Sequence, residues 1–238
     1  DPTTAADYTA RANLVAVVSN GSAVLGLGNI GPLASKPVME GKAMLFKEFG
    51  NVDAFPICLD TKDTEEIIRT VKAIAPGFGG VNLEDIKAPE CFEVETRLQE
   101  MLDIPVFHDD QHGTAIISGA ALMNACEVTK RKFEDLHVVI VGAGAAAIAT
   151  ANFYVVLGVR RENIIMADIH GIVYKGREID MDEYKGAFAT ERDVRTIKDA
   201  LKGADVLLGL SAKGAVQADW LKGMNKNPIV FTMANPDP

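Results

Sequence analysis

Short apolar runs alternate with longer amphipathic segments along this chain. Apolar runs of four to eight residues bounded by Gly, Asn or Asp are typical of buried strands, and the longer segments have helical spacing. Such alternation is typical of βαβ units around a largely parallel sheet. We expect strands at 14–19, 23–28, 54–60, 79–85, 104–109, 137–144, 163–168, 205–211 and 228–235. We expect helices near 36–49, 63–74, 89–102, 114–126, 145–157 and 193–202.

The pattern predicts two α/β domains. Asn20-Gly21 separates the first two apolar runs and favours a hairpin, so we expect a mixed sheet in the first domain. After KRKFEDL the strand–helix pattern restarts with HVVIVGAG. We therefore expect a mixed α/β domain over 1–112 and a doubly wound, Rossmann-type domain over 113–238, the latter truncated. The chain starts without Met and stops just after an apolar run, so we expect a fragment of a longer protein.

VVIVGAGAAA is an apolar run that leads into a glycine-rich turn and a helix-forming segment. Gly142, Gly144 and Ala147 occupy the GxGxxG/A positions, with Ala145 and Ala146 between them. Glycines at these positions permit a tight turn and close approach of the backbone to a pyrophosphate. The fingerprint alone is weak, and a ligand-free turn of a flavodoxin-like domain is the alternative reading.

The next apolar run, NIIMAD, adds context because it ends in an acid. Asp168 is placed to bind the adenosine ribose hydroxyls of a dinucleotide, which favours NAD. Several basic residues close by in sequence leave NADP open. They are Arg160, Arg161, His170 and Lys175.

Two further apolar runs end in pairs of acids. GGVNLED ends with Glu84-Asp85, and IPVFHDD ends with Asp109-Asp110. Right-handed crossovers place such strands side by side, with both pairs at the carboxyl edge where α/β sheets bind ligands. Four carboxylates there need compensation, and Mg²⁺ or Mn²⁺ is the expected partner. Each pair alone could instead be loop charge or a favourable helix N-terminus.

Two lysines and two histidines near these motifs are candidates for a general base and for metal ligands. Lys36 and Lys42 both lie near the start of the helix that follows LGLGNIG, and spacing does not choose between them as a base. His108 and His112 have i,i+4 spacing, but Gly113 indicates that the helix starts later. We therefore expect these histidines to orient or pack rather than to hold zinc.

Composition narrows the class of protein. A net charge of −9 without a basic patch argues against nucleic acid and anionic membranes as partners. Three cysteines without CxxC spacing indicate a reduced, cytoplasmic protein rather than a disulfide framework or a zinc site. No signal peptide or apolar run of transmembrane length is seen.

The ordered motifs resemble those of malic enzymes, in their shorter bacterial-type form. The resemblance spans the chain and rests on five blocks, VLGLGNIGPLASKPVMEGKAMLF, FGGVNLEDIKAPECF, IPVFHDDQHGTA, VVIVGAGAAA and MANPDP. It implies oxidative decarboxylation of L-malate to pyruvate and CO₂, with NAD⁺ or NADP⁺ and with Mg²⁺ or Mn²⁺. It also implies a homodimer or homotetramer.

The resemblance implies roles for individual residues. Glu84, Asp85 and Asp110 match the metal ligands. Lys42, rather than Lys36, matches the base that takes the hydroxyl proton, and Asp109 matches its hydrogen-bonding neighbour. Asn235 matches an asparagine that contacts the substrate carboxylate.

Two positions depart from the family pattern. The family's general acid is a tyrosine from a motif upstream of this chain, and Tyr8 matches a different segment. Larger members have a substrate-binding arginine where this chain has Ala23.

Two other functions remain alternatives. Another 2-hydroxyacid or amino-acid dehydrogenase would need no acidic metal cluster, and a non-catalytic nucleotide-binding module would bind cofactor without turnover.

Overall fold

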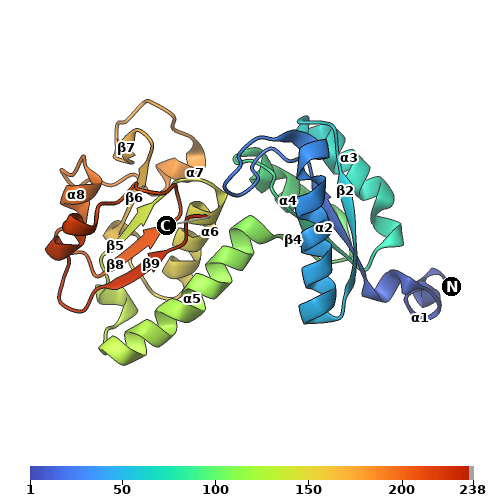
Figure 1. Cartoon of the computed structure of the whole chain (residues 1–238), viewed down its shortest axis with the longest axis horizontal. Coiled ribbons are helices and arrows are strands. Elements are labelled where there is room, and N and C mark those ends of the chain that lie inside the picture. Colours follow the sequence, from blue (N-terminus) through green and yellow to red (C-terminus); the bar gives the residue numbers. More distant parts are fainter. Residues whose placement is uncertain (236–238) are drawn as a thin grey trace. The chain divides into compact units, whose positions relative to one another are not determined.

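The structure, a computed structural model, describes residues 1–235. The chain separates into two compact units, Asp1–Asp110 and Gln111–Pro238. Each is an α/β unit with its own sheet (Figure 1). No helix in the described part of the chain is both long and apolar enough to cross a bilayer.

The first unit is built on a four-stranded sheet of order β2-β1-β3-β4, and all its strand pairs are parallel. The chain moves one way along the sheet from β1 to β2 and then reverses, so right-handed crossovers place α2 on the face opposite α3 and α4. Its elements are α1 (Ala5–Tyr8), β1 (Leu14–Ser19), α2 (Gly31–Gly50), β2 (Asp53–Cys58), α3 (Thr64–Ile74), β3 (Gly80–Leu83), α4 (Glu90–Met101) and β4 (Val106–His108).

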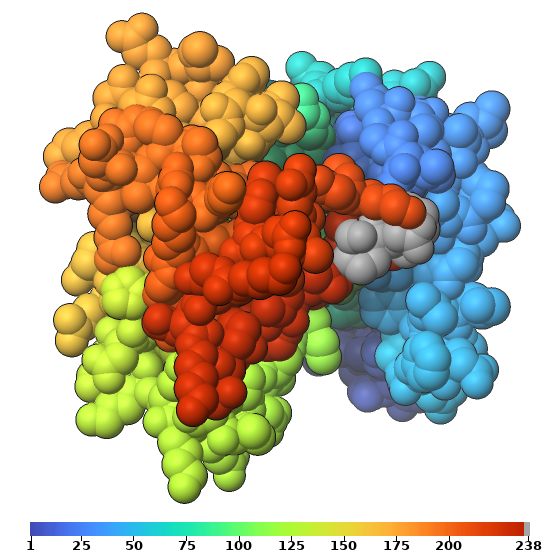
Figure 2. Space-filling model, turned by 60° about the vertical axis from the view of Figure 1, so that its left-hand side comes forward, coloured from blue at the N-terminus to red at the C-terminus, as the bar shows by residue number. Residues whose placement is uncertain are grey.

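The second unit has a five-stranded sheet of order β7-β6-β5-β8-β9, in which only β7 is antiparallel among the described strands. The orange-to-red segments that follow β7 cover much of one face of this unit (Figure 2). Its elements are α6 (Ala145–Val156), β5 (Val138–Val141), β6 (Ile164–Asp168), β7 (Gly171–Ile172), α7 (Glu183–Gly186), α8 (Ile197–Ala200), β8 (Val206–Gly209) and β9 (Ile229–Thr232). The helix α5 (Asp109–Thr129) begins with the last two residues of the first unit.

At its central strands β5, β6 and β8 the second sheet is buried on both faces, which explains why these strands are continuous apolar runs. Val139, Val141 and Leu207 pack on one face with Leu201 and with the partly buried Trp220. Burying such side chains contributes about 1.5–3 kcal/mol each. The carboxyl ends of β5, β6 and β8 are thereby held side by side.

The predicted hairpin is wrong. Residues 23–28 form a compact turn in which Val24 bridges Gly28, and β1 is flanked by β2 and β3 instead. Gly26 and Gly28 have φ of 76° and 74°, left-handed values that an extended strand does not contain. The sheet of the first unit is therefore parallel rather than mixed.

The predicted start of the helix after HDDQHG is also wrong. α5 begins at Asp109, not near Thr114, and Gly113 lies inside it. Two carboxylates in the first turn favour a helix N-terminus, which offsets the cost of about 1 kcal/mol for an internal glycine. Thus Asp109, Asp110 and His112 are helical residues.

Candidate functional site

Two acidic pairs leave the first sheet at the same edge. Glu84 and Asp85 follow β3, while Asp109 and Asp110 follow β4 in the first turn of α5. Since β3 and β4 are parallel neighbours, all four acids lie at their carboxyl ends. One oxygen each from Glu84, Asp85 and Asp110 lies within 4.8 Å of the other two. The structure therefore brings the three predicted metal ligands together.

Crowding and burial disfavour the charged forms of these carboxylates. Burial raises the pKa of Glu84 to about 7, although Lys42 opposes the rise. Burial and the neighbouring Asp110 raise the pKa of Asp85 to about 7. Burial likewise raises the pKa of Asp110 to about 6. Three clustered carboxylate oxygens that repel one another are a donor set that fits Mg²⁺ or Mn²⁺.

Lys42 lies beside this cluster on α2. Its Nζ is 2.6 Å from Asp109 Oδ2 and 3.0 Å from Glu84 Oε2. Burial lowers the pKa of Lys42, but Glu84 and Asp109 raise it more, so the net shift is upward. Lys36, one helical turn and a half earlier, pairs instead with Glu40 on the exposed surface of the helix. Of the two candidate bases, Lys42 is the one in contact with the acids.

Backbone and side-chain contacts hold the cluster in place. Asp85 N–H donates to Asp110 Oδ2 at 3.0 Å, and Ala23 N–H donates to the Asp85 carbonyl at 3.0 Å. Asp85 itself has the left-handed φ of 54°. The buried Asn82 donates from Nδ2 to Glu84 Oε2 at 2.8 Å. Sequence reasoning missed Asn82, although its place on β3, two residues before Glu84, puts it on the same face of the strand.

The two histidines of HDDQH do not form a pair on one helix. His108 is the last residue of β4 and is fully buried, with Nε2 3.8 Å from Asp110 Oδ2. His112 lies on α5. That His108 and His112 orient or pack neighbouring groups stays a prediction, and these positions are compatible with it. The predicted late start of the helix, on which it was based, is wrong.

The glycine-rich turn of the second unit joins β5 to α6. Gly142 has φ of +132°, and a Cβ there would lie 3.2 Å from the backbone of Leu210. Gly144 is the N-cap of α6 and makes no side-chain capping bond, while a Cβ there would point into open space. Ala147 is buried where α6 packs against the sheet. The first N–H groups of a helix have no partner within the helix, and with open space at Gly144 this N-terminus fits a pyrophosphate.

Asp168 ends β6, next to this turn, but its carboxylate is already engaged. Arg177 donates to both of its oxygens, from Nη1 to Oδ1 at 2.8 Å and from Nη2 to Oδ2. His170 N–H donates to Oδ1 at 2.8 Å, and Lys185 Nζ lies 3.5 Å from Oδ2. Burial raises the pKa of Asp168, but Arg177 and its other donors lower it more, so the net shift is downward.

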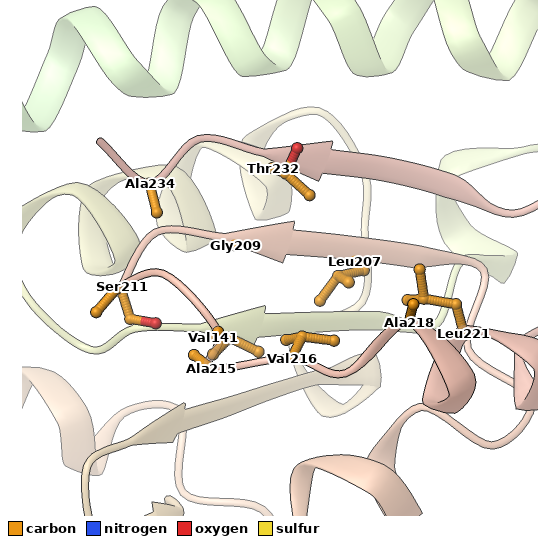
Figure 3. A pocket seen from close by; sticks show the side chains of 12 residues that line it. Val141, Leu207, Gly209, Ser211, Ala215, Val216, Ala218, Leu221, Thr232 and Ala234 are labelled. Carbon is orange, nitrogen blue, oxygen red and sulfur yellow. The ribbon is translucent and has the colours of Figure 1, made fainter. Parts of the chain in front are cut away.

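A cavity of about 210 Å³ lies on one face of the second sheet, between β5, β8 and β9 and the segment 211–221 that follows β8 (Figure 3). Pockets that enclose a whole ligand usually span about 300–1,000 Å³, so this one can hold only part of a dinucleotide. Sequence reasoning missed it, although the small residues of GLSAKGAV after β8 were its signal. Its lining consists of Val141, Leu207, Gly209, Ser211, Ala212, Gly214, Ala215, Val216, Ala218, Leu221, Thr232 and Ala234.

Asn235 lies in an exposed bend that follows β9. Met233 N–H donates to the Gly209 carbonyl at 2.8 Å, which continues the pairing of β9 with β8 up to this point. Asn235 is therefore at the carboxyl edge of the second sheet. The rest of the MANPDP motif, residues 236–238, falls outside the described residues.

Comparison with known proteins assigns both units to one family. Residues 3–99 match the family described as malic enzyme, N-terminal domain, and residues 111–238 match malic enzyme, NAD binding domain. The chain is thus an α/β protein with an acidic cluster in its first unit and a Rossmann-type dinucleotide fold in its second. The chain belongs to the malic enzyme family.

Similar proteins include both cofactor types. The chain is 58% identical over its whole length to an NADP-dependent and to an NAD-dependent malic enzyme of Rhizobium meliloti, and covers 31% of each. The solved structure of an NAD-dependent malic enzyme from Thermotoga maritima superposes with a TM-score of 0.94 at 46% identity, with 100% of this chain and 64% of that chain covered. The chain thus spans about a third of the length of the two Rhizobium meliloti enzymes.

Proposed function

We propose that the full-length protein converts L-malate to pyruvate and CO₂ while reducing NAD⁺ or NADP⁺, with Mg²⁺ or Mn²⁺ bound. The observation that carries this proposal is the contact of Lys42 with Asp109 and Glu84 beside the carboxylates of Asp85 and Asp110. A lone dinucleotide fold would need no such cluster. Another 2-hydroxyacid dehydrogenase or an amino-acid dehydrogenase would need no acidic cluster either.

Glu84, Asp85 and Asp110 would hold the divalent cation. When bound, the cation supplies Lewis-acid polarisation of the oxygens of a chelating 2-hydroxy acid. Asn82 fixes one oxygen of Glu84, and the Asp85 N–H fixes one oxygen of Asp110. The ligands are therefore preorganised by neighbours, one on the strand that leads to Glu84 and one from the end of the strand beside Asp110.

Lys42 would accept the proton of the malate C2 hydroxyl as hydride leaves C2. Glu84 and Asp109 hold the ammonium group of Lys42 beside the cluster, and although burial lowers its pKa, they shift it upward. Lys42 is thereby held at the place where a chelated hydroxyl would lie, and its nitrogen would be the proton acceptor. Asp109 keeps its hydrogen bond and orients the amine.

Gly142 and Gly144 would let the dinucleotide pyrophosphate approach the N-terminus of α6, with Ala145 and Ala146 in its first turn. Asp168 would lie at the adenosine ribose. Asn235 would contact a carboxylate of the substrate. The small-residue cavity beside Gly142 would take another part of the cofactor.

We also propose a homodimer or homotetramer in the cytoplasm. The three cysteines support this compartment, because all are free and two of them are buried, as is usual where thiols stay reduced.

The test uses the full-length protein with L-malate, Mn²⁺ and either NAD⁺ or NADP⁺, and follows reduced cofactor and pyruvate together. Equal amounts of both products, abolished by EDTA, are expected. Reduced cofactor without pyruvate would show a simple dehydrogenase. Binding of cofactor without either product would show a binding module.

A further inference from the structure

The strand β4 has one edge that pairs with no other described strand. It is the outermost strand of the first sheet, and β3 lies on its other side. The Pro105 carbonyl accepts the Val81 N–H of β3 at 2.8 Å. Residues that alternate with Pro105, Val106 and His108, direct their backbone groups to the opposite edge. Such an edge leaves N–H and C=O groups that need partners from elsewhere.

Two long side chains of α4 supply these partners. Glu95 Oε1 accepts the backbone N–H of His108 at 2.8 Å, and Gln99 Nε2 donates to the Val106 carbonyl at 3.0 Å. Glu95 and Gln99 are four residues apart and therefore lie on the same face of α4. Together they bind the edge of β4 much as a neighbouring strand would.

The two side chains differ in burial. Gln99 lies at an exposed position, whereas Glu95 is 4% exposed. A glutamate is almost never buried to this extent unless its carboxylate is paired or hydrogen-bonded. Burial, and after it the charges of Asp110 and Glu95, raises the pKa of the buried Cys91 thiol of α4 to about 12. Both carboxylates are therefore close to the inner face of α4, and Glu95 is buried beside the acidic cluster.

The N–H that Glu95 binds belongs to the residue immediately before the acids. His108 is the last residue of β4, and α5 begins at Asp109 without an intervening linker. Any shift of the His108 backbone therefore passes directly to Asp109 and Asp110. The side chain of Asp110 is held from the other direction by the Asp85 N–H, at 3.0 Å.

We propose that Glu95 is a positioning residue of the proposed cation site, which acts by fixing the backbone N–H of His108. Through that N–H it sets the place of Asp110 at the cation and of Asp109 beside Lys42. Glu95 acts through the backbone and is not itself a ligand. This inference rests on the proposed binding of a divalent cation at the acidic cluster.

The test measures Mn²⁺ binding by isothermal titration calorimetry of the full-length protein, without malate or dinucleotide. Glu95→Asp keeps the charge but shortens the side chain, so that its carboxylate no longer reaches the His108 N–H. We expect its Kd for Mn²⁺ to rise about 10- to 100-fold, the loss typical when a contact that supports a metal ligand is removed. Glu95→Gln removes the charge but keeps an acceptor oxygen at the same distance along the side chain, and it should bind Mn²⁺ nearly as tightly as the wild type.

Gln99→Leu is the matched control, because it removes the other contact between α4 and the edge of β4. It should lower the Tm and leave the Kd for Mn²⁺ unchanged. The kcat with L-malate at saturating Mn²⁺ is a second readout. It should fall in Glu95→Asp, in which Asp109 no longer orients Lys42, and it should stay near the wild-type value in Gln99→Leu.

Several results would overturn the proposal. A Kd for Mn²⁺ in Glu95→Asp within about threefold of the wild type, or an equal loss in Gln99→Leu, would show that Glu95 only supports the fold. An equal loss in Glu95→Gln would show that the charge of Glu95 matters and its contact with His108 does not. If Glu95→Asp does not fold, Glu95→Gln decides, since it must keep the affinity for Mn²⁺ and a raised Kd refutes the inference. A wild-type protein that binds no Mn²⁺ would overturn the proposed cation site itself, and this inference with it.

Discussion

Lys42 Nζ lies 2.6 Å from Asp109 Oδ2, although 67 positions of sequence separate the two residues. The contact joins α2 to the first turn of α5 across the carboxyl edge of the first sheet. The contact places the ammonium group of Lys42 beside carboxylates that would otherwise only repel one another.

Lys42→Met should lower kcat by about two to four orders of magnitude, the range of general-base catalysis, because methionine keeps the length of the side chain but cannot take a proton. Steady-state kinetics with L-malate measure the effect. Lys36→Met on the same helix is the control and should keep nearly full kcat. A larger loss in Lys36→Met than in Lys42→Met would move the base to the other lysine.

Asp110→Asn should weaken Mn²⁺ binding by at least about 100-fold, more than the loss typical of residues that only support a metal ligand. Thermal unfolding with and without Mn²⁺ measures this: a ligand at 100 times its Kd stabilises by about 2.7 kcal/mol, and that gain should vanish in the variant. Asp103→Asn, at an exposed position of the same unit, should keep the Mn²⁺ response. An undiminished response in Asp110→Asn would exclude Asp110 as a ligand.

Gly144→Ala should weaken dinucleotide binding by about tenfold or more and leave the fold intact. A methyl group there meets nothing in the protein, but it stands at the N-cap of α6, where the pyrophosphate would approach the helix. Calorimetry gives the affinity, and the Tm shows whether the fold is preserved. Gly186→Ala, where a Cβ also meets nothing, is the matched control. If both variants bind NAD⁺ equally well, the pyrophosphate does not lie at this turn.

Asp168→Asn should lower the free energy of unfolding by about 2–4 kcal/mol near pH 7, because it leaves Arg177 without its buried partner. The pKa of Asp168 is lower in the folded protein than its ordinary 3.8, so its contribution is fully present above that value and is lost as the pH falls through the folded pKa. Urea unfolding at several pH values should therefore give a constant difference between wild type and variant from pH 8 to 5. A difference that already shrinks above pH 5 would contradict the lowered pKa.

Local pattern predicted much of the architecture. The apolar runs at 14–19 and 163–168 became β1 and β6 with bounds within one residue, because buried parallel strands are short, continuous and apolar. The acidic pairs could be placed at one edge because right-handed crossovers leave little freedom in a parallel sheet. The strand order around β1 could not be predicted, since it depends on which edges of β1 the later strands occupy.

Contacts between distant or aperiodic segments were beyond sequence reasoning. The pairing of Asp168 with Arg177 depends on the irregular path from β7 to α7, which has no hydrophobic period to indicate it. The choice of Lys42 over Lys36 likewise depends on which side of α2 faces the sheet edge. The resemblance to malic enzymes implied that Lys42 is the base, whereas spacing alone did not distinguish Lys42 from Lys36.

Asp85 combines a place among the clustered acids with a left-handed backbone. Asparagine and glycine adopt that conformation readily, while β-branched residues do not. Position 85 can therefore change to asparagine or glycine with the backbone undisturbed. That one substitution removes one of the three clustered carboxylates, so a descendant of this chain without the proposed cation site would persist as a stable, folded protein with a different role.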